Sequence, residues 1–291
     1  MILNVSGRCD VLAFYSEWFL NRLNEGYFDV RNPFNKRLVS RIYIEDIDMY
    51  VFCTKNPIPS LSYISKIDKP ILYMVTLTGY SFDLEPGVKN KDLIIDAIKK
   101  ISSIIGKDNV YLRYDPIILN DKYTIYYHEK ALNKLLFELK DSISKVIFSF
   151  VDEYKNTKEN KKDIMYHEPK EFELKYLSNL FKELENKYKI PFEACCEDKY
   201  LSYGFKRGIC ISQKLAFEKT GKAFPLWKER DCLCAKIVDI GEYNCCPNYC
   251  KYCYANFNED SIKENVSLHD KNSSLLIGRL KEDDIIKRRV D

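Results

Sequence analysis

Short apolar runs alternate with longer amphipathic segments along most of the chain. The apolar runs predict strands at 2–6, 48–57, 71–80, 109–118, 145–154, 190–198 and 235–241. The segments between them have helical spacing and predict helices at 13–26, 91–106, 123–143 and 171–189. A strand followed by a helix, repeated five or six times, is typical of a parallel sheet with crossover helices.

Most of the predicted strands are apolar at successive positions rather than at alternate ones, so both faces of the sheet should be covered. This favours a TIM-like (β/α) barrel with helices outside. A doubly wound open sheet is the alternative, because periodicity does not show whether a sheet closes. The predicted division is a (β/α) barrel at 1–203, a cysteine-rich region that includes the last strand at 204–257, and a polar extension at 258–291.

Composition and charge narrow the class of protein only slightly. The 291 residues include 46 basic and 43 acidic side chains, and a net charge of +3 does not by itself indicate a nucleic-acid surface. Arg8, Asp10 and Glu17 interrupt the apolar N-terminal segment, so a cytoplasmic protein without membrane contact is expected. None of the 10 glycines forms a phosphate-binding fingerprint, which argues against a nucleotide triphosphatase or a Rossmann dehydrogenase.

The cysteines are unevenly distributed. Of the 11, all except Cys9 and Cys53 lie between 195 and 253. In a reducing compartment such residues are more often thiols or metal ligands than disulfides. The C-terminal third of the chain is therefore where metal chemistry is expected.

The densest cysteine stretch is YNCCPNYCKYCYAN, from 243 to 256. Cys246, Cys250 and Cys253 are spaced C-x3-C-x2-C, and Tyr252 precedes the third. Three thiolates on one loop can ligate three irons of a cubane and leave the fourth iron open to a substrate or cofactor. A zinc site is the alternative, because the pair Cys232 and Cys234 could combine with Cys250 and Cys253.

Polar side chains follow several of the predicted strands. Arg8 and Asp10 follow the first, Lys55 and Asn56 follow the second, and Arg113 with Asp115 lie in the fourth. Functional groups of parallel barrels lie at the carboxyl ends of the strands. The sequence therefore predicts a polar mouth at that edge.

The strand, the cysteine spacing and the YAN that follows it resemble the cluster-binding loop of radical S-adenosylmethionine enzymes, and CPNYCKYCYAN is most similar to the spore photoproduct lyase branch. RYDPI at 113–117 is similar to a barrel motif of that branch. The whole chain resembles the family called domain of unknown function 1848, through AFYSEWF, VRNPFN, TKNP, RYDPI and DIGEYNCCPNYCKYCYAN. The match covers nearly all of the sequence, and that family has no known reaction.

The resemblance implies a [4Fe–4S] cluster on Cys246, Cys250 and Cys253, S-adenosylmethionine as a cofactor, and an electron donor such as ferredoxin or flavodoxin. It places Tyr252 near the adenine or the cluster and puts Arg113 and Asp115 in the pocket. In those enzymes the cluster loop follows the first barrel strand, whereas here it follows the last. A circularly permuted layout is therefore expected, with the last strand beside the first and the cluster loop beside Arg8 and Asp10.

Four further cysteines form a second set, Cys196, Cys210, Cys232 and Cys234. They could close an auxiliary iron–sulfur cluster or a zinc site, or one of them could cap the first cluster. The leading hypothesis is an iron–sulfur enzyme that cleaves S-adenosylmethionine to a 5′-deoxyadenosyl radical, acting on a small-molecule or nucleic-acid substrate. The alternative is a non-catalytic binding protein stabilised by zinc or iron–sulfur, with nucleic acid as its partner.

Overall fold

A seven-stranded parallel sheet forms the centre of the computed structural model, which describes residues 1–152, 164–228 and 232–290. The strand order is β8-β7-β6-β5-β4-β1-β9, and every neighbouring pair is parallel. The strands are β1 (Ile2–Asn4), β4 (Met49–Thr54), β5 (Ile71–Thr76), β6 (Val110–Ile117), β7 (Lys145–Phe150), β8 (Phe192–Ala194) and β9 (Val238–Asp239). Each lies within one of the predicted apolar runs.

The helices between the strands also follow the predicted pattern. They are α1 (Val11–Phe14), α2 (Ser16–Glu25), α3 (Lys91–Ile105), α4 (Ile125–Leu139) and α6 (Glu171–Tyr188). The side chains of Asn90 and Thr124 accept backbone hydrogen bonds as N-caps of α3 and α4, and Gly106 ends α3. Short 3₁₀ turns lie at Ile44–Asp46, Ile58–Ser62, Ile64–Lys66, Lys107–Asn109 and Asp198–Tyr203.

The two faces of the sheet are covered by different parts of the chain. Alternate strand residues such as Phe52, Tyr73 and Leu112 pack with the helices in the main core. Their neighbours, including Val51 and Met74, pack against residues of 209–228, which contains α7 (Gln213–Thr220), and of 232–237. Burial on both faces explains why the strands are apolar at successive positions.

The α/β fold with a parallel sheet is confirmed, but a closed barrel is not found. β8 and β9 lie at opposite edges of the sheet, and in the described part of the chain no ladder joins them. Both edge strands are very short, which leaves few backbone groups with which to close a ring. From β1 to β8 the strands of this sheet follow one another across it in chain order, whereas in a doubly wound sheet the strand order reverses at a switch point.

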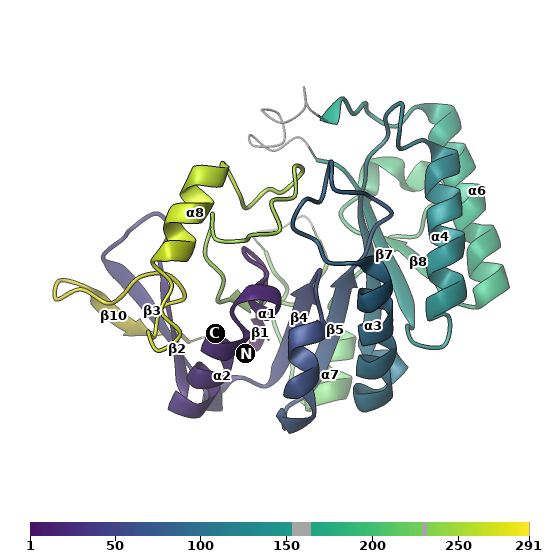
Figure 1. The fold of residues 1–291 in the computed structure, drawn as a ribbon. Helices are drawn as coiled ribbons and strands as arrows, with labels where there is room; N and C mark the ends of the chain where they lie inside the picture. The colour runs from purple at the N-terminus through teal and green to yellow at the C-terminus, as the bar shows by residue number, and fades with distance from the viewer. Residues whose placement is uncertain (153–163, 229–231, 291) are drawn as a thin grey trace.

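A second, smaller sheet was not predicted. It has the order β10-β3-β2, with β2 (Tyr27–Arg31), β3 (Leu38–Tyr43) and β10 (Ile285–Arg288). The C-terminal segment, predicted as a polar extension, forms α8 (Glu259–Ser267) and returns to pair β10 with β3, at the far side of the molecule from α4 and α6 (Figure 1). None of the helices in the described residues is both long and apolar enough to span a membrane.

Candidate functional site

The cysteine loop begins beside the first strand. β9 pairs with β1 in parallel, with Leu3 opposite Val238 and Asn4 opposite Asp239. The last strand thus lies beside the first, as predicted, and both strands deliver their loops to the same edge of the sheet. Asp239 then joins the two loops, accepting hydrogen bonds from Arg8 Nε at 2.7 Å and from the Gly7 N–H at 2.9 Å.

Asp10 holds three loops of this edge together. Its Oδ1 accepts from the Ala13 N–H at 3.2 Å and caps α1. Its Oδ2 accepts from the Lys55 N–H at 2.8 Å and from Asn248 Nδ2 at 3.2 Å, which links the end of β4 to the cysteine loop. Asp10 is buried, and burial raises its pKa, although the donors around it act in the opposite direction. Its contacts are those of a positioning residue.

The structure brings Cys246, Cys250 and Cys253 together on the loop. Burial raises the pKa of Cys253 to about 11, and the nearby Cys246 adds to this shift. The Ala255 N–H donates to Cys253 Sγ at 3.4 Å, and backbone N–H groups also favour the thiolate of Cys246. The sulfurs of Cys246 and Cys253 thus already have backbone donors, which is the environment that an anionic iron–sulfur cluster needs.

Cys9 is a close neighbour of this loop that sequence spacing did not identify. Its Sγ donates to the Cys245 carbonyl at 3.3 Å, and its thiol also contacts Cys246 and lowers the pKa of Cys246. Tyr15 reaches the same Cys245 carbonyl with its hydroxyl at 2.6 Å. A single cysteine far from the motif gives no spacing signal; only the pairing of β9 with β1 reveals it.

Lys55 and Tyr252 meet at a buried carboxylate that was not predicted, Glu85. Lys55 Nζ donates to Glu85 Oε1 and to Tyr252 Oη, both at 2.8 Å, and Tyr252 Oη also contacts Glu85. Although burial opposes the charge on Lys55, Glu85 and Cys250 raise its pKa. The Tyr252 ring is buried edge-on against Tyr80, with 5.9 Å between the ring centroids. Lys55 therefore places a positive charge beside the cysteine loop.

The loop after β5 packs directly on the cysteine loop. The Gly87 N–H donates to the Asn248 carbonyl at 3.0 Å, and the Lys251 N–H donates to the Leu84 carbonyl at 3.0 Å. A Cβ at Gly87 would lie 2.2 Å from the Pro247 carbonyl oxygen. Only glycine allows this close approach, so residue 87 fixes how the two loops meet.

Arg113 and Asp115 form an ion pair further along the same edge. Arg113 Nε donates to Asp115 Oδ2 at 3.0 Å, and Ser149 Oγ contacts Asp115 Oδ1. Glu197 follows β8 and accepts from the Phe150 N–H at 2.7 Å, and burial raises its pKa to about 8. These side chains lie at the carboxyl ends of β6, β7 and β8, where the sequence predicts a polar mouth.

Asn56, the remaining predicted binding residue, is buried beside β4. Its Oδ1 accepts from the Ile58 N–H at 3.3 Å and its own N–H donates to Thr54 Oγ1 at 2.9 Å. Both bonds shape the turn that follows β4. The second predicted cysteine set lies apart from the loop. Cys210, Cys232 and Cys234 pack on the sheet face that α7 covers, and Cys196 is exposed.

The thiols are not arranged around a single point. Among residues 1–152, 164–228 and 232–290, no three His, Cys, Asp or Glu side chains are placed to hold one metal ion. Each cysteine of a cubane ligates a different iron, so the sulfurs of such a site stand apart by more than those around one ion. The loop offers three thiols, two of them with backbone donors, and the Lys55 ammonium nearby, and this composition fits a cubane.

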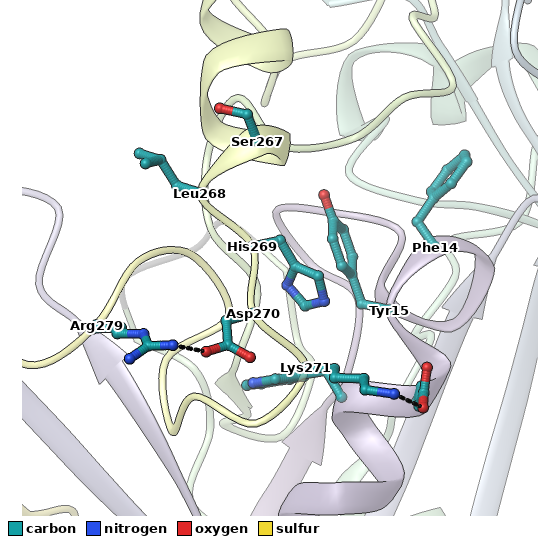
Figure 2. A pocket seen from close by; sticks show the side chains of 10 residues that line it. Phe14, Tyr15, Ser267, Leu268, His269, Asp270, Lys271 and Arg279 are labelled. Atoms are coloured by element: carbon teal, nitrogen blue, oxygen red, sulfur yellow. Dashed lines mark hydrogen bonds and ion pairs between the residues drawn. The ribbon is translucent and has the colours of Figure 1, made fainter.

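A pocket of about 630 Å³ lies away from the predicted site residues (Figure 2). Tyr15, His269 and Lys271 line it, and Arg279 is paired there with Asp270 at 2.6 Å. The Tyr15 ring stands edge-on to His269, with 4.6 Å between the centroids. Tyr15 links this pocket to the cysteine loop, because its hydroxyl donates a hydrogen bond to the Cys245 carbonyl.

Fold and site together define an α/β protein with a cysteine loop at the carboxyl edge of a parallel sheet. The model of the family called domain of unknown function (DUF1848) matches residues 2–255. The chain belongs to that family. No curated protein matches the sequence.

Proposed function

We propose that the protein is an iron–sulfur enzyme related to radical S-adenosylmethionine enzymes, with one [4Fe–4S] cluster held by Cys246, Cys250 and Cys253. The carrying observation is that these thiols lie on one loop at the edge where β9 pairs with β1, with backbone donors on the sulfurs of Cys246 and Cys253. In this proposal the sheet is an open, circularly permuted relative of the (β/α) barrel of those enzymes. A ferredoxin- or flavodoxin-type protein would supply electrons.

When bound and reduced, such a cluster supplies the electron that cleaves S-adenosylmethionine to methionine and a 5′-deoxyadenosyl radical. The chain's own residues position the loop and balance its charge. Lys55 offsets negative charge at Cys250, and its ammonium is held in place by Glu85 and Tyr252. Asp10 and Gly87 fix the loop against the ends of β4 and β5.

The mouth beyond the loop carries groups for binding a polar substrate. Arg113 presents a guanidinium already paired with Asp115, and Glu197 can exchange a proton near neutral pH, because its pKa is about 8. Both lie at carboxyl ends of strands of the same sheet as the cysteine loop. We therefore assign substrate binding to this edge and the radical chemistry to its β9 end.

The test is anaerobic purification, reconstitution with iron and sulfide, and incubation with dithionite and S-adenosylmethionine. We expect about four irons bound through the loop and formation of 5′-deoxyadenosine. The triple variant Cys246→Ala, Cys250→Ala, Cys253→Ala should lose this iron and the product. Cys245→Ser is the matched control, because Cys245 lies outside the three-cysteine spacing and its side chain donates to the Glu242 carbonyl, at 3.1 Å, a bond that serine keeps. A colourless protein with zinc on the loop would refute the proposal.

Whether the fourth iron of the proposed cluster is free to bind S-adenosylmethionine depends on whether Cys9 ligates it. Its thiol contacts Cys246, so it is the described cysteine outside the loop best placed to become a fourth ligand. If the proposal is right, Cys9→Ser keeps the iron content, the electron paramagnetic resonance signal and the change in that signal on adding S-adenosylmethionine. If Cys9→Ser alone makes the signal responsive to S-adenosylmethionine, the corner is closed in the wild type and the enzyme proposal fails.

A further inference from the structure

The second group of cysteines lies on the sheet face that α7 covers, opposite α3, α4 and α6. Cys195 directly follows β8, and its sulfur lies 3.4 Å from Cys210 Sγ and 4.0 Å from Cys196 Sγ. Cys234 contacts the thiols of both Cys210 and Cys232. Cys195 was not among the predicted ligands, yet it is the one that joins the end of β8 to this group.

Backbone hydrogen bonds hold these thiols in place. The Cys195 N–H donates to the Phe148 carbonyl at 2.8 Å, which extends the β7–β8 ladder by one residue. The Ala235 N–H donates to the Ile211 carbonyl at 2.8 Å, so the residues that follow Cys210 and Cys234 are bonded to each other. Main-chain contacts thus fix the backbone at Cys195 and next to Cys210 and Cys234, which holds these three thiols near one another.

We propose that Cys195, Cys210, Cys232 and Cys234 form a tetrathiolate site for one zinc ion, separate from the cluster loop. Four sulfurs at about 2.3 Å from a tetrahedral zinc lie about 3.8 Å from one another. The distance of 3.4 Å between Cys195 Sγ and Cys210 Sγ is close to this value, whereas a cubane holds its cysteine sulfurs further apart. In the described residues no three of these thiols already surround one point, so zinc binding would require side-chain rotations that move the sulfurs from mutual contact to positions around one ion.

Exposure and backbone direction separate Cys195 from Cys196. Cys210 and Cys234 are buried and Cys195 is partly buried, whereas Cys196 is exposed. Cys196 has a left-handed backbone, with φ of +58°, and its sulfur contact in the group is with Cys195. We therefore place Cys196 outside the site.

The surroundings balance the charge of a zinc tetrathiolate, which is formally −2. The Arg113 guanidinium lies close enough to Cys210 and Cys195 to interact with both electrostatically, and the Ile211 N–H donates to Cys234. Beneath the thiols lie the buried side chains of Met74, Tyr111 and Ile147. A closed ion here would fasten the 209–237 segment to the sheet, which is the role of structural zinc.

The experiment counts zinc and iron per chain in anaerobically purified wild type, in the triple Cys246→Ala, Cys250→Ala, Cys253→Ala variant, and in Cys210→Ser and Cys234→Ser. We expect about one zinc in the wild type and in the triple variant, and loss of most of it in each serine variant. Cys196→Ser is the matched control and should keep the zinc. Iron bound through the loop is counted separately, so failure of either site is seen independently of the other.

Cobalt exchange covers the case in which the serine variants do not fold. Replacing zinc by Co²⁺ in the wild type and in the triple variant should give the visible absorption and sulfur-to-cobalt charge-transfer bands of a tetrahedral tetrathiolate site. The inference is overturned if the triple variant holds no zinc and gives no such bands. It is also overturned if the triple variant keeps about four irons, or if Cys196→Ser loses as much zinc as Cys210→Ser.

Discussion

Replacement of Glu85 by glutamine should destabilise the protein by a magnitude that the structure allows us to work out. The Glu85 side chain is 2% exposed. It accepts hydrogen bonds from Lys55 Nζ at 2.8 Å, Thr78 Oγ1 at 2.7 Å and Lys91 Nζ at 2.9 Å, and it contacts Tyr252 Oη. The Glu85→Gln substitution would leave two ammonium groups without their shared carboxylate.

Burial acts to raise the pKa of Glu85, but Lys55 and Lys91 outweigh it and lower the pKa from 4.5 to about 2. A difference of roughly 2.5 units corresponds to about 3 kcal/mol. Because the folded-state pKa is depressed, this stability is fully present above pH 4.5 and is lost as the pH falls towards 2. At pH 3 about half of it should remain.

The assay is urea unfolding of wild type and Glu85→Gln with matched metal content, at pH 7 and pH 3. We expect the free energies of unfolding to differ by about 3 kcal/mol at pH 7 and by about half as much at pH 3. Glu138→Gln is the matched control, because its pair with Lys99 at 2.7 Å is exposed, and it should leave the free energy of unfolding essentially unchanged. A Glu85→Gln difference that is absent at pH 7, or equal at both pH values, would refute the reasoning.

Three further substitutions test how the edge of the sheet is built. Gly87→Ala would bring a Cβ to 2.2 Å from the Pro247 carbonyl oxygen and push the two loops apart. Iron per chain after reconstitution should therefore fall several-fold. An unchanged iron count would show that the loops can separate without loss of binding. Asp10→Asn places an amide against the Lys55 N–H and Asn248 donors and should lower the free energy of unfolding in urea by about 2 kcal/mol. An unchanged free energy of unfolding would show that these bonds do not stabilise the fold. Burial raises the pKa of Glu197 to about 8, so wild-type stability should decline as pH rises from 4.5 through 8, and Glu197→Gln should remove that decline. Equal slopes for wild type and variant would contradict the Glu197 assignment.

The main sheet was predictable because its strands are buried on both faces. A run such as 71–76 is apolar at successive positions, which identifies a strand without any knowledge of its partners. The smaller sheet could not be predicted, because β2 and β3 mix charged and apolar residues and all four residues of β10 are exposed. An exposed strand is specified by its partner, which a local pattern does not reveal.

The candidate site shows the same division. The spacing of Cys246, Cys250 and Cys253 is local, and it pointed to three residues that the structure does bring together. Glu85 lies in a polar loop with no motif, so its burial between Lys55 and Lys91 could not be inferred. The choice between Cys195 and Cys196 depends on which of two adjacent side chains turns towards the sheet, and spacing alone does not decide that.

The order of the strands explains why a cysteine loop near the end of the chain lies beside loops from the N-terminal strands. Because β1 lies between β4 and β9, the loops after these three strands leave the sheet side by side. Asp10, on the central loop of the three, bonds to Lys55 on one side and to Asn248 on the other. The cysteine loop therefore takes its shape from contacts with segments more than 150 residues away in sequence, such as Gly87 to Asn248 and Gly7 to Asp239. It follows that cluster binding should require the complete sheet, and that a perturbation at β1 or β4 should release iron before it removes zinc held beside β8.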